Sequence, residues 1–199
     1  MKMKAKNILI VGVGGQGVLL ASEILSDVAM KAGFDVKKSE VHGMSQRGGV
    51  VSSHVKFAKK VYSPIIPYGD ADILISFEQA EALRALDWVK KKGMVATSTT
   101  RLVPPITASG KFSYPDDPVA EIKKKTQNVV AIDADKIALK LGNIRLVNTL
   151  LLGAISNQLD FDNEIWQQSF KDRVKAKFVD INLKAFAEGQ KLADNGSGK

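Results

Sequence analysis

The chain has 199 residues, 45% of them hydrophobic and 25% charged, and its 29 Lys and Arg against 21 Asp and Glu give a net charge of +8. Because it contains no cysteine, disulfides, thiolate nucleophiles and cysteine-ligated zinc or iron–sulfur clusters are excluded within this chain. Its apolar runs are too short to cross a bilayer, so we expect no contact with a membrane. We expect a single domain over 1–193 and a disordered tail over 194–199.

The first 41 residues predict a strand, a tight loop, a helix and a second strand. Residues 7–11 form a short apolar run that ends at glycines, which is typical of a strand buried on both faces. Apolar side chains at helical spacing predict a helix over 18–31, with Gly33 as its stop. Residues 34–41 have the composition of a strand. Together these elements predict a βαβ unit whose two strands pair in parallel.

The next part of the chain predicts a loop and a hairpin. Residues 42–49 are too rich in glycine for the interior of a helix or strand, which indicates a loop positioned by the elements around it. Two extended segments, 50–57 and 60–66, are joined by a lysine-rich turn. They predict an antiparallel hairpin added to the sheet.

The rest of the chain begins with strands and ends with helices. A buried strand over 72–77 precedes a predicted helix over 78–92, and the prolines at 104, 105, 115 and 118 indicate a long connection of weak structure. Short apolar runs predict further strands over 94–97 and 129–132. Apolar residues at three-to-four spacing predict helices over 135–141, 147–157, 163–174 and 181–193. These elements predict an α/β fold, a Rossmann-like layered domain with a mostly parallel sheet, a β-hairpin addition and a helical C-terminal third.

Residues 12–17, Gly-Val-Gly-Gly-Gln-Gly, match the G-x-G-x-x-G pattern between a predicted strand and a predicted helix. Glycines let the backbone approach a ligand, and the N–H groups at the start of the helix favour a phosphate. Glu40 lies about 20 residues further on, where a carboxylate that binds the ribose is expected. A self-sufficient NAD(P)- or FAD-binding oxidoreductase is therefore one hypothesis. Close packing of helix against strand, without a nucleotide, is the other.

Two features weigh against a self-sufficient dehydrogenase. After the predicted βαβ unit the chain has no room for a second, substrate-binding domain. Its two histidines, His42 and His54, can in principle act as general bases or metal ligands. Neither lies in a cluster with ligand spacing, and a lone histidine is more often a hydrogen-bonding group. We therefore expect no metal site.

The positive charge lies in short, separate lysine runs without interleaved aromatic residues, which is typical of solvated loops and helix ends. The runs are 37–38, 59–60, 90–92 and 123–125. We expect no binding to nucleic acid, and attraction to an anionic partner or ligand is the other use of the charge. The N-terminal segment lacks the apolar stretch of a secretory signal, so we expect a cytoplasmic protein.

Six segments, in chain order, match a known family. They are Gly14-Gly15-Gln16-Gly17, Gly43-Met44-Ser45-Gln46-Arg47-Gly48-Gly49, Ser63-Pro64-Ile65-Ile66-Pro67, Ala71-Asp72-Ile73-Leu74, 147–154 and 182–189. Together they resemble the gamma-type domain of the 2-oxoacid:ferredoxin oxidoreductases over almost the whole chain. The segment 43–49 is far more specific than a glycine pattern. Within that family, the size and C-terminal helix are most similar to small subunits of enzymes that act on aryl pyruvates; gamma subunits of pyruvate or 2-oxoglutarate enzymes are the alternative.

The resemblance implies a division of labour between subunits. In that family a larger partner subunit holds thiamine diphosphate and [4Fe–4S] clusters, decarboxylates the 2-oxoacid and passes two electrons to ferredoxin. The acyl group goes to coenzyme A, which is a co-substrate. This chain is then expected to hold no cofactor of its own and to work only in a hetero-oligomer.

We expect a ligand-binding or inter-subunit site around the glycine loop. Arg47, between Gln46 and two glycines, can offer a bidentate guanidinium to a phosphate or carboxylate, or pair with a carboxylate of the partner subunit. Glu78 follows a buried strand, where α/β sheets place ligand residues, although starting a helix is its simpler role. No catalytic residue is assigned. The expected site residues are Gly14, Gly15, Gln16, Gly17, His42, Gln46, Arg47, Gly48, Gly49 and Glu78.

Overall fold

The computed structural model describes residues 5–42, 49–103 and 113–196. Within them, six strands form one sheet in the order β2-β3-β1-β4-β5-β6. The strands are β1 (Lys6–Val13), β2 (Asp35–His42), β3 (Val50–Ala58), β4 (Ala71–Ser76), β5 (Val89–Ser98) and β6 (Val129–Ile132).

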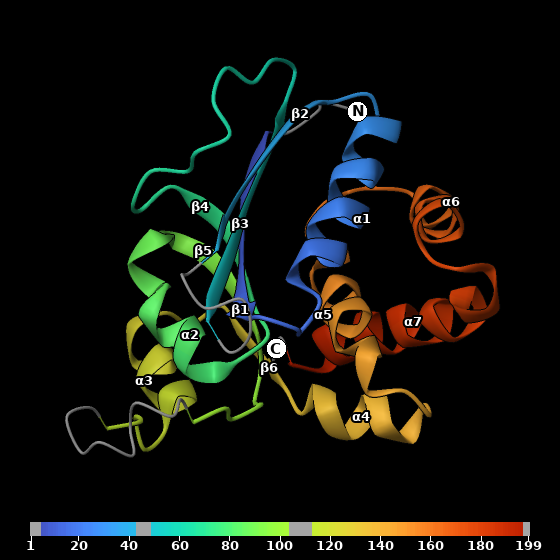
Figure 1. The fold of residues 1–199 in the computed structure, drawn as a ribbon. Helices are drawn as coiled ribbons and strands as arrows, with labels where there is room; N and C mark the ends of the chain where they lie inside the picture. The colour runs from blue at the N-terminus through green and yellow to red at the C-terminus, as the bar shows by residue number, and fades with distance from the viewer. Residues whose placement is uncertain (1–4, 43–48, 104–112, 197–199) are drawn as a thin grey trace.

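Helices cover both faces of this sheet (Figure 1). One face carries α1 (Val18–Lys31), α4 (Ala134–Lys140), α5 (Val147–Ser156), α6 (Asn163–Arg173) and α7 (Val179–Gly196). The other face carries α2 (Gln79–Arg84) and α3 (Pro118–Lys125). Short 3-10 turns are η1 (Leu86–Trp88), η3 (Ile144–Leu146) and η4 (Ala176–Phe178). Among the described helices, none combines the length and hydropathy that a bilayer crossing requires.

The pairing of the strands confirms a mostly parallel sheet with an added hairpin. Strands β1, β4, β5 and β6 run parallel to one another, and β3 is antiparallel to both β1 and β2. The hairpin is therefore formed by β2 and β3. The predicted parallel pair of β1 and β2 is wrong, because β3 is inserted between them over its whole length.

The predicted hairpin between 50–57 and 60–66 is also wrong. Both edges of β3 are already occupied by β1 and β2, so the chain after it has no free edge to pair with. Residues 60–66 contain no strand. They contact the sheet through isolated hydrogen bonds instead of a strand ladder. One of these runs from the Ile66 N–H to His54 Nδ1 at 3.1 Å.

Two predicted boundaries need correction, and one helix was not predicted. The helix predicted over 78–92 ends at Arg84, and β5 starts at Val89, well before the predicted 94–97. The early start of β5 places Lys90 beside β4, where its ammonium contacts Asp72 at 2.9 Å. In the region predicted as a weakly structured connection, α3 begins with Pro118 in its first turn, and the side chain of Asp117 accepts a hydrogen bond from Ala120 N–H at 2.9 Å.

The four predicted C-terminal helices are confirmed, with ends that differ by up to three residues from the predicted ones. Helix α7 continues to Gly196 and so includes the first three residues of the expected tail, while 197–199 lie outside the described residues. Along α5 and α7 the two backbones come into contact. A Cβ on Gly153 would lie 2.2 Å from the Phe186 carbonyl oxygen, and one on Gly189 would lie 2.1 Å from that of Leu150.

The apolar core has one layer on each face of the sheet. Alternate residues of β1 serve the two layers, because successive side chains of a strand point to opposite faces. Ile8 and Ile10 pack in the larger layer with α1, α5 and α7, and Leu9 and Val11 pack in the smaller one with α2 and α3. This confirms the prediction that the first strand is buried on both faces.

Candidate functional site

The glycine loop lies between two neighbouring strands whose following helices pack on opposite faces of the sheet. Strands β1 and β4 are neighbours, but the chain leaves β1 towards α1 on one face and β4 towards α2 on the other (Figure 1). In open α/β sheets ligands bind at such a point, outside the carboxyl ends of the strands. Residues 12–17 follow β1 and Phe77-Glu78 follow β4, so two predicted parts of the site meet at this edge.

Gln16 joins the ends of the two strands. Its Oε1 accepts a hydrogen bond from the Val13 N–H at 2.7 Å, and its Nε2 donates to the Phe77 carbonyl oxygen at 3.0 Å. A Cβ on Gly12 would lie 2.9 Å from Gln16 Oε1 and 3.0 Å from Phe77 Cβ. The packing role considered for this loop is therefore realised at Gly12 and Gln16.

The remaining glycines shape the loop for close approach. Gly15 and Gly17 have φ values of +102° and +91°, in the left-handed region that favours glycine. A Cβ on Gly17 would lie 3.2 Å from Asn148 Nδ2, whereas at Gly15 the described residues place no atom within 4 Å. Gly14 N–H donates to the Gly49 carbonyl oxygen at 2.8 Å, which brings the start of β3 to the loop.

Part of the expected site lies outside the described residues. Gln46, Arg47 and Gly48 belong to the segment 43–48, and the backbone of His42 ends β2. Their roles stay predictions. The hydrogen bond from Gly14 to Gly49 places Gly49, the first described residue after this segment, against the glycine loop.

Glu78 takes the simpler of its two predicted roles and anchors a second segment. Its side chain is buried, and its Oε2 accepts a hydrogen bond from the Glu81 N–H at 2.9 Å, which starts α2. Its Oε1 accepts from the Leu102 N–H at 3.2 Å and from the Tyr114 hydroxyl. Burial and this carboxylate raise the pKa of Tyr114, so its hydroxyl remains a donor.

A pocket of about 450 Å³ opens beside the glycine loop. Its lining includes the predicted residues Gly15, Gln16 and Gly17 and, from three other segments, Thr100, Leu102, Asp135, Arg145 and Asn148. The Asp135 carboxylate accepts a hydrogen bond from the Thr100 hydroxyl at 2.8 Å. The exposed Arg145 brings a guanidinium to the rim. The pocket thus offers one cation, one carboxylate and the open backbone of Gly15.

The prediction from sequence missed Thr100, Asp135 and Arg145. Thr100 follows β5 by two residues, and Asp135 lies in the first turn after β6. The rule that singled out Glu78, namely that ligand residues follow the carboxyl ends of buried strands, would have found these two as well. Arg145 precedes α5 and carries no such signal, because only the tertiary fold brings η3 to this edge.

His54 and Glu40 lie away from this pocket. His54 is buried, accepts the Ile66 N–H and packs against Trp88 with 5.2 Å between ring centroids, which confirms a hydrogen-bonding histidine. Glu40 pairs with Lys38 at 2.7 Å. A ribose carboxylate is expected at the end of the strand next to β1, but β3 separates β2 from β1, so the interpretation of Glu40 as a ribose ligand is not supported.

Across the described ranges, no group of three or more His, Asp or Glu side chains could hold a metal ion. With no cysteine in the sequence, the residues present do not fit an iron–sulfur cluster either.

Comparison with known proteins places this architecture in a family. The model of the pyruvate ferredoxin/flavodoxin oxidoreductase family matches residues 7–192. The chain belongs to this family. An indolepyruvate oxidoreductase subunit IorB of Pyrococcus horikoshii is 42% identical, over 96% of this chain and 97% of that protein. The common gamma subunit of the pyruvate/ketoisovalerate oxidoreductases of Pyrococcus furiosus is 23% identical, over 89% and 91%.

Solved structures share the fold of this chain. The gamma subunit of a keto/oxoacid ferredoxin oxidoreductase from Geobacter sulfurreducens matches with a TM-score of 0.71 and 22% identity, over 96% of this chain and 99% of that one. A 2-oxoglutarate:ferredoxin oxidoreductase from Magnetococcus marinus matches with a TM-score of 0.74 and 19% identity, over 96% of this chain but 31% of that one. The fold therefore occurs both as a separate chain and as part of a longer one.

Proposed function

We propose that this chain is the small, cofactor-free subunit of an indolepyruvate:ferredoxin oxidoreductase. The complex oxidatively decarboxylates aryl pyruvates to aryl-acetyl-CoA, with coenzyme A as co-substrate and ferredoxin as electron acceptor. The observation that carries the proposal is the 42% identity to an IorB subunit over nearly the full length of both chains. The identity of 23% to a common gamma subunit makes a pyruvate-type enzyme the weaker alternative.

In this proposal a larger partner subunit holds thiamine diphosphate and the [4Fe–4S] clusters, and the two subunits form a hetero-oligomer in the cytoplasm. The composition supports this division, because a chain without thiolates has no ligand of the kind that clusters need. The partner's cofactors supply the decarboxylation and the electron transfer. This chain contributes binding and positioning.

This chain's part of the shared site is the pocket beside the glycine loop. The N–H groups at the start of α1 and the Arg145 guanidinium would hold an anionic group, either a phosphate of coenzyme A or a carboxylate of the partner subunit. Asp135 orients the Thr100 hydroxyl at the same pocket. Arg47 is retained as a second candidate ligand for this anion on its sequence alone, because it lies two residues before Gly49, whose carbonyl oxygen accepts a hydrogen bond from the Gly14 N–H.

Co-expression of this chain with its partner subunit tests the proposal. We expect a brown complex that reduces methyl viologen with indolepyruvate and coenzyme A, and faster than with pyruvate, while the isolated chain is inactive. A preference for pyruvate would support the gamma-subunit alternative. Turnover by the isolated chain, or micromolar binding of NAD(P)H to it, would instead support a self-sufficient oxidoreductase.

A further inference from the structure

Five lysines line one groove near the amino ends of β5 and β6. The groove has a volume of about 520 Å³ and contains Lys91 and Lys92 of β5, Lys123, Lys124 and Lys125 at the end of α3, and residues 126–128. We call it the basic groove. The strands β1, β5 and β6 run parallel, and the glycine loop lies at their carboxyl ends. The basic groove therefore lies at the opposite, amino ends of the strands.

Most of the positive charge in the basic groove is not neutralised by the chain itself. Lys124 pairs with Glu121 at 2.5 Å, and the neighbouring Lys90 turns to Asp72 and Asp70. For the other four ammonium groups, those of Lys91, Lys92, Lys123 and Lys125, no carboxylate of the described ranges lies within 4 Å. Four exposed like charges therefore share one concave surface.

The helix dipole explains only part of this arrangement. Lysines in the last turn of a helix are attracted to the partial negative charge there, which accounts for Lys123–Lys125 at the end of α3. It does not account for Lys91 and Lys92, which come from a strand. Bringing the two sets together raises their mutual repulsion, and an anionic occupant would remove it.

The chemistry of the basic groove favours an acidic protein over the other anions. Its lining has neither an arginine, which would grip a phosphate with two hydrogen bonds, nor an aromatic ring on which a base could stack. Permanent subunit interfaces are depleted in lysine. Hydrated lysine charges instead steer the encounter with a transient partner and set its dependence on salt.

We propose that the basic groove is a docking surface for a small acidic electron-carrier protein, held by its clustered carboxylates. The proposal rests on the proposed function, because a ferredoxin-dependent complex must meet a soluble acceptor protein in every catalytic cycle. The chain itself supplies only the attraction, since it holds no redox group. Binding is expected to weaken as the salt concentration rises.

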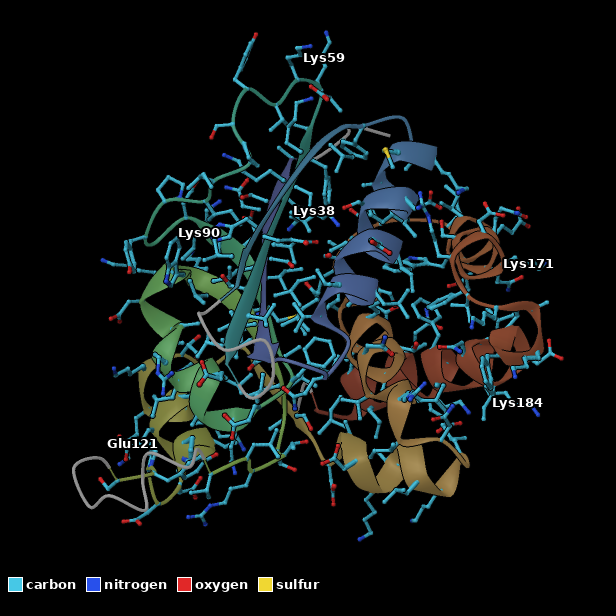
Figure 2. The ribbon with its side chains drawn as sticks, in the orientation of Figure 1. Lys38, Lys59, Lys90, Glu121, Lys171 and Lys184 are labelled. Carbon is cyan, nitrogen blue, oxygen red and sulfur yellow. The ribbon has the colours of Figure 1, made fainter. Side chains whose placement is uncertain are left out.

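Titration of the complex of this chain and its partner subunit with a fluorescently labelled acidic ferredoxin, at low and at high salt, tests the proposal. One variant replaces Lys91, Lys92, Lys123 and Lys125 by Gln. The matched control replaces Lys59, Lys171, Lys175 and Lys184 by Gln, removing the same charge elsewhere; Lys59, Lys171 and Lys184 lie on other sides of the molecule (Figure 2). We expect the groove variant to raise the Kd about tenfold and to flatten the salt dependence, and the control to change the Kd less than about twofold.

Several outcomes would overturn the proposal. Equal weakening by both variants would show that only the overall charge matters, and an unchanged Kd in the groove variant would show that ferredoxin binds elsewhere. A groove variant that no longer assembles with the partner subunit would make the groove a subunit interface. Reduction of methyl viologen by the wild-type complex is measured separately, so failure of the proposed function is seen without affecting the binding titration.

Discussion

Individual residues of the glycine loop serve two different purposes. Gln16 uses both ends of its amide within the fold, on Val13 and Phe77, so its first role is to hold the ends of β1 and β4 together. Gly15 has a different role, because the described residues leave open space where a Cβ would be and its backbone is therefore accessible to a ligand. A G-x-G-x-x-G pattern alone does not separate these roles, because both require glycine.

At the same scale, His54 makes the stability of the chain sensitive to pH. Burial, with the charge of Lys56 as the lesser cause, lowers the pKa of His54 from its usual 6.5. The unfolded chain therefore binds more protons than the folded chain as the pH falls below that value. The contribution of the neutral, buried His54 to the free energy of unfolding should be fully present above about pH 7. It should be lost progressively as the pH falls towards the lowered pKa. Urea unfolding at a series of pH values measures this.

The variant His54→Asn should lose this part of the pH dependence, since it keeps an acceptor for the Ile66 N–H but cannot titrate. Lys184→Ala, which changes an exposed side chain and leaves His54 in place, is the control and should retain the wild-type dependence in this range. An unchanged slope in His54→Asn would contradict the assignment.

At the scale of elements, the contact between α5 and α7 determines how the substitution Gly153→Ala changes stability, through two effects of opposite sign. Replacing Gly153 by Ala in a helix should stabilise it by about 0.5–1 kcal/mol through backbone entropy. The added Cβ, however, would lie 2.2 Å from the Phe186 carbonyl oxygen, which is backbone and cannot turn away. Overpacking of this kind costs about 1–3 kcal/mol, so Gly153→Ala should lower the free energy of unfolding in urea.

The sign of that change is the test. Lys184→Ala, on the exposed side of α7, introduces an alanine without a steric clash and should leave the stability within about 0.5 kcal/mol. If Gly153→Ala were more stable than the wild type, the two helices would not approach each other so closely.

For the whole molecule, the composition predicts the outcome of a reconstitution experiment. The isolated chain, incubated with iron and sulfide under reducing conditions and then desalted, should stay colourless, because it has no thiolate to ligate a cluster. The partner subunit treated in the same way is the control and should gain broad visible absorption. Iron retained by this chain in a fixed ratio after desalting would refute the division of labour between the subunits.

Local patterns in the sequence were sufficient for much of this fold. The helix predicted over 18–31 and the strand over 129–132 are confirmed residue for residue, and α4, α5 and α6 differ from their predicted ends by one residue at most. Periodicity of apolar side chains and glycine stops are properties of neighbouring residues, so they can be read before the chain folds. The absence of thiolates and the family membership were likewise determined by the sequence itself.

Contacts between distant residues were decided only by the tertiary structure. The insertion of β3 between β1 and β2 depends on which strand edges are free, and no local pattern encodes this. The same holds for the pocket that joins Gly15 to Asp135 and Arg145, and for the groove that gathers lysines of β5 and α3. Chain segments that are far apart in sequence meet because the sheet and its helices must bury their apolar faces together, and the polar residues at their ends are brought along.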